Sequence, residues 1–360
     1  MTFYWLNEMD PLERWKAVLR GESVDRVPLH MNLLGHSAIA LGYQNLGDFY
    51  SKPEVCIKCQ MIAREMYGYD QPPELISPGY GAAEWGSEVE LPYRPAMSAP
   101  AVRDPVVKTA EDLEKLEIPD PRTAAYMKEY HDMVKLALEY KQFPLVTIFG
   151  GCVSATAPQV VEVEQFMIWT RLEPGLCRKA LDKTAEFAIR MAEYFAEEFG
   201  TDGWIPADWL PTDANVLISA ETFEKLVLPS LARVHQKVLD LGLQAWFTHW
   251  CSDHLNTINA GLVEKVPMGD PGILYFGPEN DLKFIAERFG KRHIITGSVD
   301  PTTILIGSFD EVLQLCKQDI EKAKHSPRGY MLGSGCELPP RAPPANVYAF
   351  VKASREYGKY

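Results

Sequence analysis

Short runs of apolar residues alternate with longer amphipathic stretches along most of the chain. The apolar runs are four to six residues long and end in turns rich in Gly, Asp and Ser, a pattern that indicates buried strands. Helical stretches follow most of these runs, and strands that alternate with helices pair in parallel. The pattern therefore predicts a parallel sheet whose strands occupy residues 26–31, 145–149, 204–209, 245–250, 273–276, 294–297 and 329–333.

Several predicted helices begin with clear capping signals. Asp10 can cap a helix that has Pro11 at its first position, and Glu13 completes a capping-box pattern. Ser308 and Glu311 repeat that pattern near the end of the chain. Further helices are predicted over 174–199, 219–241 and 344–357, and a glycine follows each of the three.

About eight strand–helix units fit in 360 residues, which is typical of a (β/α)8 TIM barrel. The segment 70–119 is rich in Pro and Gly, so we expect it to form a long insertion or a long βα loop. No linker-like stretch divides the chain, and the sequence predicts one α/β domain over residues 1–360 with a helix at its N-terminus. In this fold the active site lies at the carboxyl ends of the strands.

Composition narrows the class of function. The formal net charge is −13 and basic residues form no blocks, which argues against binding to nucleic acid or to an anionic membrane surface. The chain has no apolar run of about 18 residues and no signal-peptide pattern, so we expect a cytoplasmic protein. Its seven cysteines lack disulfide spacing, which favours metal or catalytic roles, although Cys56 and Cys59 lie in a helical stretch and are predicted to pack in the core.

The most specific chemical signal is His249-Trp-Cys251, followed 85 residues later by Cys336. Both pieces lie where a predicted strand runs into a polar turn. Alternate residues on a strand point to the same side, so His249 and Cys251 could reach one ion. One imidazole and two thiolates suit zinc, and three protein ligands leave a fourth position open for chemistry. The sequence thus predicts a catalytic zinc site, with three unrelated buried polar residues as the alternative.

Other candidates lie at the same predicted strand ends. Asp208 is a candidate catalytic acid, whereas Asp213 is expected to be a loop cap. Asp300 either caps the next helix or lines the pocket. Trp209 and Trp250 would give the pocket a flat apolar wall that suits an aromatic substrate or the face of a corrin, with ordinary core packing as the alternative.

Four segments carry a family resemblance. The segments 13–21, 24–28, 297–301 and 335–346 resemble the uroporphyrinogen decarboxylase superfamily, which implies a (β/α)8 barrel across nearly the whole chain. True decarboxylases of that superfamily carry arginines after the Arg-x-Pro motif for the carboxylates of the substrate. The corresponding segment here, 31–37, contains no arginine.

The His-x-Cys pair and the late cysteine look like the cobalamin-dependent methyltransferase branch of that superfamily. The resemblance implies that His249, Cys251 and Cys336 bind Zn²⁺, and that a methyl group moves between a small molecule and the cobalt of cobalamin or of a separate corrinoid protein. The small molecule would be a thiol or an aryl methyl ether. Thiol-using members usually continue Cys-Gly-Asn, whereas this chain reads Cys-Ser-Asp-His over 251–254.

Within this hypothesis, Asp208 or His254 would orient the substrate or move a proton. Two alternatives remain open at the level of sequence. One is a decarboxylase of another cyclic or aromatic acid, which would keep its activity after chelation. The other is a non-enzymatic protein that binds a corrinoid or another tetrapyrrole, although pure binding needs no open metal site.

Overall fold

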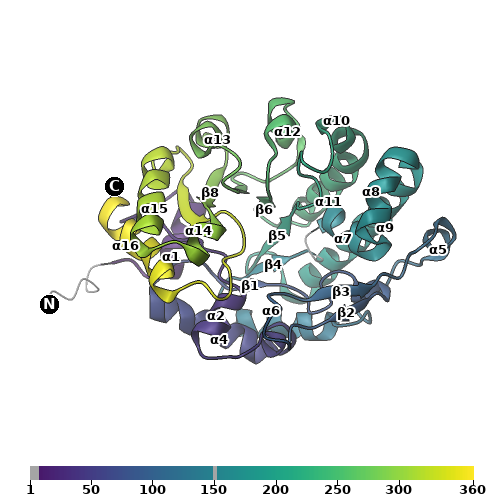
Figure 1. Cartoon of the computed structure of the whole chain (residues 1–360), viewed down its shortest axis with the longest axis horizontal. Helices are drawn as coiled ribbons and strands as arrows, with labels where there is room; N and C mark the ends of the chain where they lie inside the picture. Colours follow the sequence, from purple (N-terminus) through teal and green to yellow (C-terminus); the bar gives the residue numbers. More distant parts are fainter. Residues whose placement is uncertain (1–7, 149–151) are drawn as a thin grey trace. The chain divides into compact units, whose positions relative to one another are not determined.

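The structure is a computed structural model that describes residues 8–148 and 152–360 (Figure 1). Its main sheet has seven strands, paired in parallel, in the order β1-β4-β5-β6-β7-β8-β9. The strands are β1 (Glu74–Leu75), β4 (Leu145–Thr147), β5 (Ile205–Trp209), β6 (Phe247–Trp250), β7 (Ile273–Phe276), β8 (Ile294–Val299) and β9 (Tyr330–Ser334).

An eighth parallel segment lies beside β9. Leu29 forms a parallel bridge with Leu332, whose amide donates to the carbonyl of Pro28 at 2.9 Å. The prediction of a regular strand over 26–31 was nevertheless wrong. Pro28 has no amide proton, so the segment forms isolated bridges rather than a continuous ladder. The alternation of eight parallel segments with helices confirms the predicted (β/α)8 fold class.

The described chain divides into two compact units. The first unit contains the residues up to Tyr43 together with Lys58–Pro73 and Asp270–Tyr360, and the second contains Gln44–Ile57 and Glu74–Gly269. The organisation of the chain as a single domain stays a prediction.

In the first unit, the predicted caps begin the predicted helices. Asp10 accepts a hydrogen bond of 3.1 Å from the amide of Glu13 at the start of α1 (Pro11–Leu19). Ser308 and Glu311 form a complete capping box before α15 (Phe309–Ala323), which packs against α16 (Pro344–Tyr357). The other helices of this unit are α2 (Gly35–Ala40), α13 (Leu282–Phe289) and α14 (Pro301–Ile306), and α4 (Pro53–Tyr67) is shared with the second unit.

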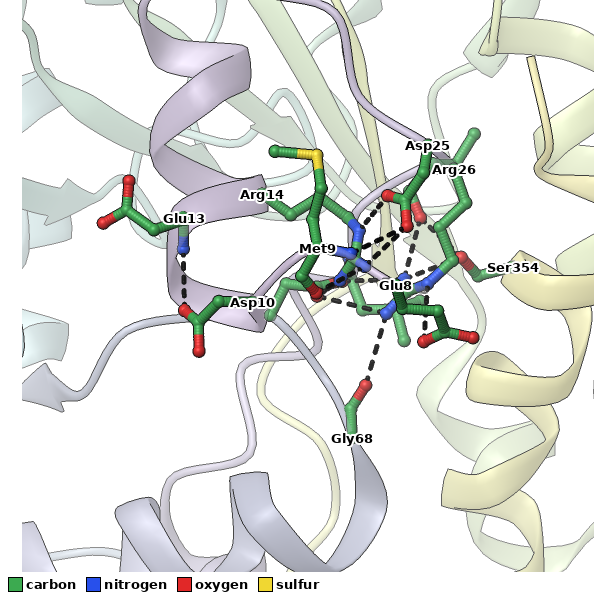
Figure 2. A network of polar contacts seen from close by, with 12 residues as sticks. Glu8, Met9, Asp10, Glu13, Arg14, Asp25, Arg26, Gly68 and Ser354 are labelled. Atoms are coloured by element: carbon green, nitrogen blue, oxygen red, sulfur yellow. Dashed lines mark hydrogen bonds and ion pairs between the residues drawn. The ribbon is translucent and has the colours of Figure 1, made fainter. Parts of the chain in front are cut away.

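A buried charge network also belongs to the first unit (Figure 2). Arg14 is fully buried and donates to Asp25 through Nε and Nη2 and to Asp70 through Nη1. Arg26 donates to both oxygens of Asp70 at 2.8 and 3.2 Å, and its Nη1 also reaches Ser354 Oγ at 3.0 Å. These contacts join the two N-terminal motifs of the family resemblance to α16, which gives those motifs a role in the fold.

In the second unit, α7 (Cys152–Val161), α9 (Pro174–Phe199) and α11 (Leu228–Asp240) pack against one another. The predicted helix over 219–241 begins at the cap Ser219 but contains a π-helical stretch, η3 (Phe223–Val227). Pro229 cannot donate to the carbonyl of Lys225, which accepts instead from Arg178 at 2.6 Å. The remaining elements of this unit are α3 (Gly47–Ser51), α5 (Ala110–Lys115), α6 (Met127–Glu139), α8 (Val163–Leu172), α10 (Ala220–Thr222), α12 (Leu255–Asn259), η2 (Ala83–Trp85) and η4 (Val263–Lys265).

The Pro- and Gly-rich segment 70–119 is more than an insertion. It supplies β1 to the main sheet and forms an antiparallel hairpin of β2 (Glu88–Glu90) and β3 (Ala101–Asp104) before α5. The predicted strand 145–149 is described only as far as residue 148, because residues 149–151 lie outside the described part of the chain. Within the described residues, no helix is long and apolar enough to span a membrane.

Candidate metal centre

His249 and Cys251 lie at the carboxyl end of β6 in the second unit. In the register of β5 with β6, Trp209 pairs with His249 and Asp208 pairs with Thr248. Because successive side chains alternate between the two sides of a sheet, Trp209 shares the side of His249, and Asp208 lies on the opposite side. His249 is buried and Cys251 is half-buried. The register therefore separates Asp208 from the predicted ligands.

The turn that follows Cys251 is tied to the segment after β5. The amide of Leu210 donates to the carbonyl of His249 at 2.9 Å, and the amide of Asn215 donates to the carbonyl of Asp253 at 2.7 Å. Ser252 has a φ of 66°, in the left-handed region that favours glycine. The departure from Cys-Gly-Asn thus falls on a residue that keeps a glycine-like backbone conformation.

His254 is a backbone anchor in this structure. Its ring is fully buried and lies edge-on to Trp250, with ring centroids 5.2 Å apart. Nε2 lies 2.9 Å from the carbonyl oxygen of Cys251. A carbonyl can only accept, so Nε2 carries the proton. Burial lowers the pKa of His254 to about 4, which keeps the ring neutral at pH 7. The predicted role of His254 in orienting the substrate or moving a proton stays a prediction.

Cys336 follows β9 in the first unit, in a tightly packed turn. The amide of Gly335 donates to the carbonyl of Val299 at 2.6 Å, and a Cβ atom at Gly335 would overlap Pro278. Ser334 is fully buried, and its Oγ lies 2.6 Å from the carbonyl oxygen of Cys336. Glycine at position 335 is therefore required for the close approach that fixes the backbone before Cys336.

His249, Cys251 and Cys336 each offer one ligand atom, and these atoms lie within 4.8 Å of one another. A group of one imidazole and two thiols could hold a metal ion. Its donor types suit zinc better than Mg²⁺ or Ca²⁺, which prefer oxygen ligands. Three ligands would leave one tetrahedral position for a fourth group.

Asp208 is held by a histidine that the sequence analysis missed. Asp208 Oδ2 lies 2.9 Å from His235 Nε2, and both side chains are fully buried. His235 Nδ1 lies 2.8 Å from the carbonyl oxygen of Pro267, which can only accept, so Nδ1 carries a proton. A second proton must then lie between Nε2 and the carboxyl group. Asp208 and His235 therefore form a buried pair with one proton in the hydrogen bond between them. A catalytic role of Asp208 stays a prediction.

Asp213 is also buried and lies near enough to Asp208 for their charges to interact. Ser154 Oγ donates to Asp213 at 2.5 Å. Burial, together with the nearby charge of Asp208, raises the pKa of Asp213 to about 7. Asp208 Oδ1 is buried and has no hydrogen-bond partner among residues 8–148 and 152–360. We call Asp208, His235, Asp213 and Ser154 the proton-sharing cluster.

His235 could have been found from the sequence with one further step. It lies on the buried face of α11 with Leu231, Val234 and Val238. A histidine among apolar residues at helical spacing needs a polar partner, because an unpaired buried polar group is costly. The pattern of strand residues around Asp208 does not identify that partner, because the contact joins a residue of β5 to a residue of α11.

The remaining predicted residues have different environments. Asp300 accepts from the amides of Thr302 and Thr303 and so caps α14, which was one of its two predicted roles. Trp250 is fully buried and its ring contacts Phe223, as the core-packing alternative expects. A contact between Trp250 and a cofactor stays a prediction. Trp209 is half-buried on the side of His249, where an aromatic pocket wall stays a prediction.

Comparisons with known proteins cover almost the whole chain. A family model described as uroporphyrinogen decarboxylase (URO-D) matches residues 10–357. The methylcobamide:CoM methyltransferase MtaA of Methanosarcina barkeri (strain Fusaro) is 26% identical over 368 residues, which cover 98% of this chain and 99% of that protein. A uroporphyrinogen decarboxylase of Trichodesmium erythraeum is 24% identical over 262 residues, which cover 70% of this chain and 69% of that protein.

A solved structure supports the fold. A methyltransferase from Methanosarcina mazei matches with a TM-score of 0.79 at 22% identity, and the match covers 97% of this chain and 99% of that chain. At this level of identity the similarity establishes a shared fold, not a shared substrate.

Proposed function

Since the chain belongs to the uroporphyrinogen decarboxylase family, we propose that it is a zinc-dependent methyltransferase within that family. It would move a methyl group between a small molecule and the cobalt of cobalamin or of a corrinoid protein. The donor group of His249, Cys251 and Cys336 carries this proposal. The similarity to methylcobamide:CoM methyltransferases, which extends over nearly the full length of both chains, supports it.

The chain would contribute ligands, orientation and a dry environment. His249, Cys251 and Cys336 would hold the ion, and a bound zinc would supply positive charge that stabilises sulfur or oxygen in the charged state. Trp209, on the side of His249, would give an apolar surface next to the substrate. An aryl methyl ether and a thiol both suit this arrangement, and the flat aromatic surface favours the ether.

The environment of His36 argues against a decarboxylase for polycarboxylates. His36 stands in the segment 31–37 that lacks arginine. It is buried between the carbonyl of Pro340 and the hydroxyl of Tyr67, each at 3.1 Å. Burial lowers the pKa of His36 to about 4, so the residue carries no charge at pH 7. This segment therefore offers no cation from His36 to bind a substrate carboxylate.

A methyl-transfer assay tests the proposed function. Purified protein with and without added zinc would be incubated with methylcobalamin and a panel of thiols, or with cob(I)alamin and a panel of methoxyarenes. We expect the absorbance of the corrinoid to change with one of the two panels, and only with the metal-loaded protein. The Cys251→Ala variant should lose at least 100-fold in rate, whereas Cys177→Ala, at a buried cysteine outside the ligand group, should stay within about 5-fold. Turnover by metal-free protein would contradict the proposal.

A further inference from the structure

The backbone carbonyl of each candidate cysteine ligand is bound by a buried side chain of its own unit. In the second unit, His254 Nε2 donates to the carbonyl of Cys251 at 2.9 Å. In the first unit, Ser334 Oγ lies 2.6 Å from the carbonyl oxygen of Cys336. Neither His254 nor Ser334 belongs to the ligand group. The same type of contact therefore occurs next to both cysteines.

His254 is fixed from several directions. It is the N-cap residue of α12, and its carbonyl accepts from the amide of Ile258 at 2.8 Å. Its ring lies against Trp250, which is fully buried. The ring thus links a rigid helix start to the turn at Cys251. Ser252, inside this turn, has a left-handed backbone, and the contact from His254 to the carbonyl of Cys251 spans it.

Ser334 performs the corresponding task at the end of β9. Its hydroxyl has one proton and lies close to two carbonyl oxygens, 2.7 Å from that of Met31 and 2.6 Å from that of Cys336. The hydroxyl oxygen of Tyr275 lies 3.5 Å from Ser334 Oγ. Donation to the carbonyl of Cys336 closes the turn, and donation to the carbonyl of Met31 ties Ser334 to a distant part of the first unit. With Gly335 packed against Pro278, the backbone around Cys336 has little room to move.

We propose that His254 and Ser334 are positioning residues that orient the two cysteine ligands through their backbone carbonyls. The inference rests on the proposed function, because it presupposes that the ligand group holds a metal. Fixing the carbonyl fixes the peptide plane next to Cα, which restricts the direction of the Cα–Cβ bond and so the positions that each Sγ can reach through its χ1 rotamers. Groups outside the ligand shell that orient metal ligands contribute about 10- to 100-fold to metal affinity in other proteins. His254 and Ser334 act before the metal arrives, by reducing the freedom of the empty ligands.

Zinc affinity measured by competition with a chromophoric chelator tests this role on the full-length protein. We expect His254→Leu and Ser334→Ala each to raise the zinc dissociation constant about 10- to 100-fold. His254→Gln has an amide N–H that can still reach the carbonyl of Cys251, so it should stay within about 5-fold of the native chain. It also serves if His254→Leu fails to fold. With Co²⁺ in place of zinc, the thiolate-to-metal absorption band of His254→Leu should shift.

Two matched variants separate positioning from general stability. Ser354 is a buried serine of the first unit whose Oγ donates to the carbonyl of Val27, which is no candidate ligand. His235 is a buried histidine of the second unit that donates to the carbonyl of Pro267. Ser354→Ala and His235→Gln should lower the urea midpoint of the metal-free protein but leave the zinc dissociation constant within about 3-fold.

The outcomes distinguish the two hypotheses. If the native chain binds one zinc and both His254→Leu and Ser334→Ala bind it within 2-fold, the positioning role is overturned and the proposed function stands. An equal loss of affinity in the two matched variants would also overturn it, since stability alone would then explain the effect. If the native chain binds no zinc, the proposed function fails, and the positioning role fails with it.

Discussion

Two polar regions of this chain each hold a buried carboxyl group, Asp70 in one and Asp208 in the other, but they give it different partners. In the charge network of the first unit, guanidinium donors from Arg14 and Arg26 contact both oxygens of Asp70, and Arg14 also forks onto Asp25. In the proton-sharing cluster of the second unit, no Arg or Lys contact accompanies Asp208, and one of its oxygens has no partner among the described residues. In the first region the carboxylate is paired with guanidinium groups. In the second the carboxyl group shares a hydrogen-bond proton with an imidazole.

The two regions are expected to respond differently to pH. Although burial acts to raise it, the hydrogen bonds from Arg14 bring the pKa of Asp25 down to about 2. The stability that Asp25 contributes is therefore present above about pH 4 and is lost as the pH falls toward 2. Asp213 behaves in the opposite sense, because burial raises its pKa. The first region should thus lose stability as the pH falls below about 4, and the second as the pH rises from about 4 through 7.

The largest expected effect comes from breaking the charge network. Asp70→Ala would leave two buried guanidinium groups without their shared carboxylate, which costs about 3–5 kcal/mol. The free energy of unfolding in urea at pH 7 measures this cost. A loss below 1 kcal/mol would mean that Asp70 does not stabilise the charge network, and the two regions would then not differ in the way described.

The Asp213→Asn variant tests how the stability of the second region depends on pH. The pKa of about 7 in the folded chain exceeds the unfolded value of about 4, so the stabilising effect of the bound proton is complete below pH 4 and is lost as the pH rises through 7. The asparagine variant should therefore match the native chain at pH 4 and exceed its stability at pH 8, by on the order of 2–4 kcal/mol. Parallel urea titrations from pH 4 to pH 8 measure the difference. Parallel stability curves for the two proteins would contradict the raised pKa.

Substitutions at Asp208 test the contribution of its hydrogen bond with His235. Asp208→Ala removes the partner of His235 Nε2 and should cost about 1–3 kcal/mol. Asp208→Asn keeps an N–H donor for a neutral imidazole and should cost less. The free energy of unfolding in urea at pH 7 measures both losses. If Asp208→Ala were as stable as the native chain, the contact between Asp208 and His235 would contribute nothing to stability.

The smallest effect is expected at an exposed pair that serves as the reference. Glu111 and Lys115 form an ion pair on the surface of α5. Glu111→Ala should change the free energy of unfolding by less than about 0.5 kcal/mol, because solvent screens exposed charges. A larger loss would show that surface pairs also matter in this chain, and burial would then not explain the cost at Asp70.

Much of the fold could be predicted from local signals. The bounds of β7 and α16 agree with the predicted ranges, because an apolar run and a proline start mark them in the sequence. The helix 174–199 ends where Gly200, with a φ of 72°, ends it. The strand around Leu29 was overpredicted, since one missing amide at Pro28 breaks the ladder. The π-helical stretch before Pro229 depends on a contact with Arg178 that is distant in sequence.

The candidate site could be predicted in part. The spacing of His249 and Cys251 on one strand indicates that both point to the same side. The side on which Asp208 lies depends on the register between β5 and β6, which the sequence alone does not specify. His254 contacts the carbonyl three residues before it, and Ser334 contacts the carbonyl two residues after it. Both contacts are local in sequence, but they depend on the conformations of the two turns, which the residue types alone do not specify.

The zinc content of the purified native chain tests the central claim most directly, with Cys251→Ala and Cys336→Ala measured beside it and Cys177→Ala as the control. We predict about one zinc per chain in the native protein and in Cys177→Ala, and much less than one in the other two variants. Native protein without zinc after purification and reconstitution, or full zinc content in Cys251→Ala and Cys336→Ala, would contradict the account.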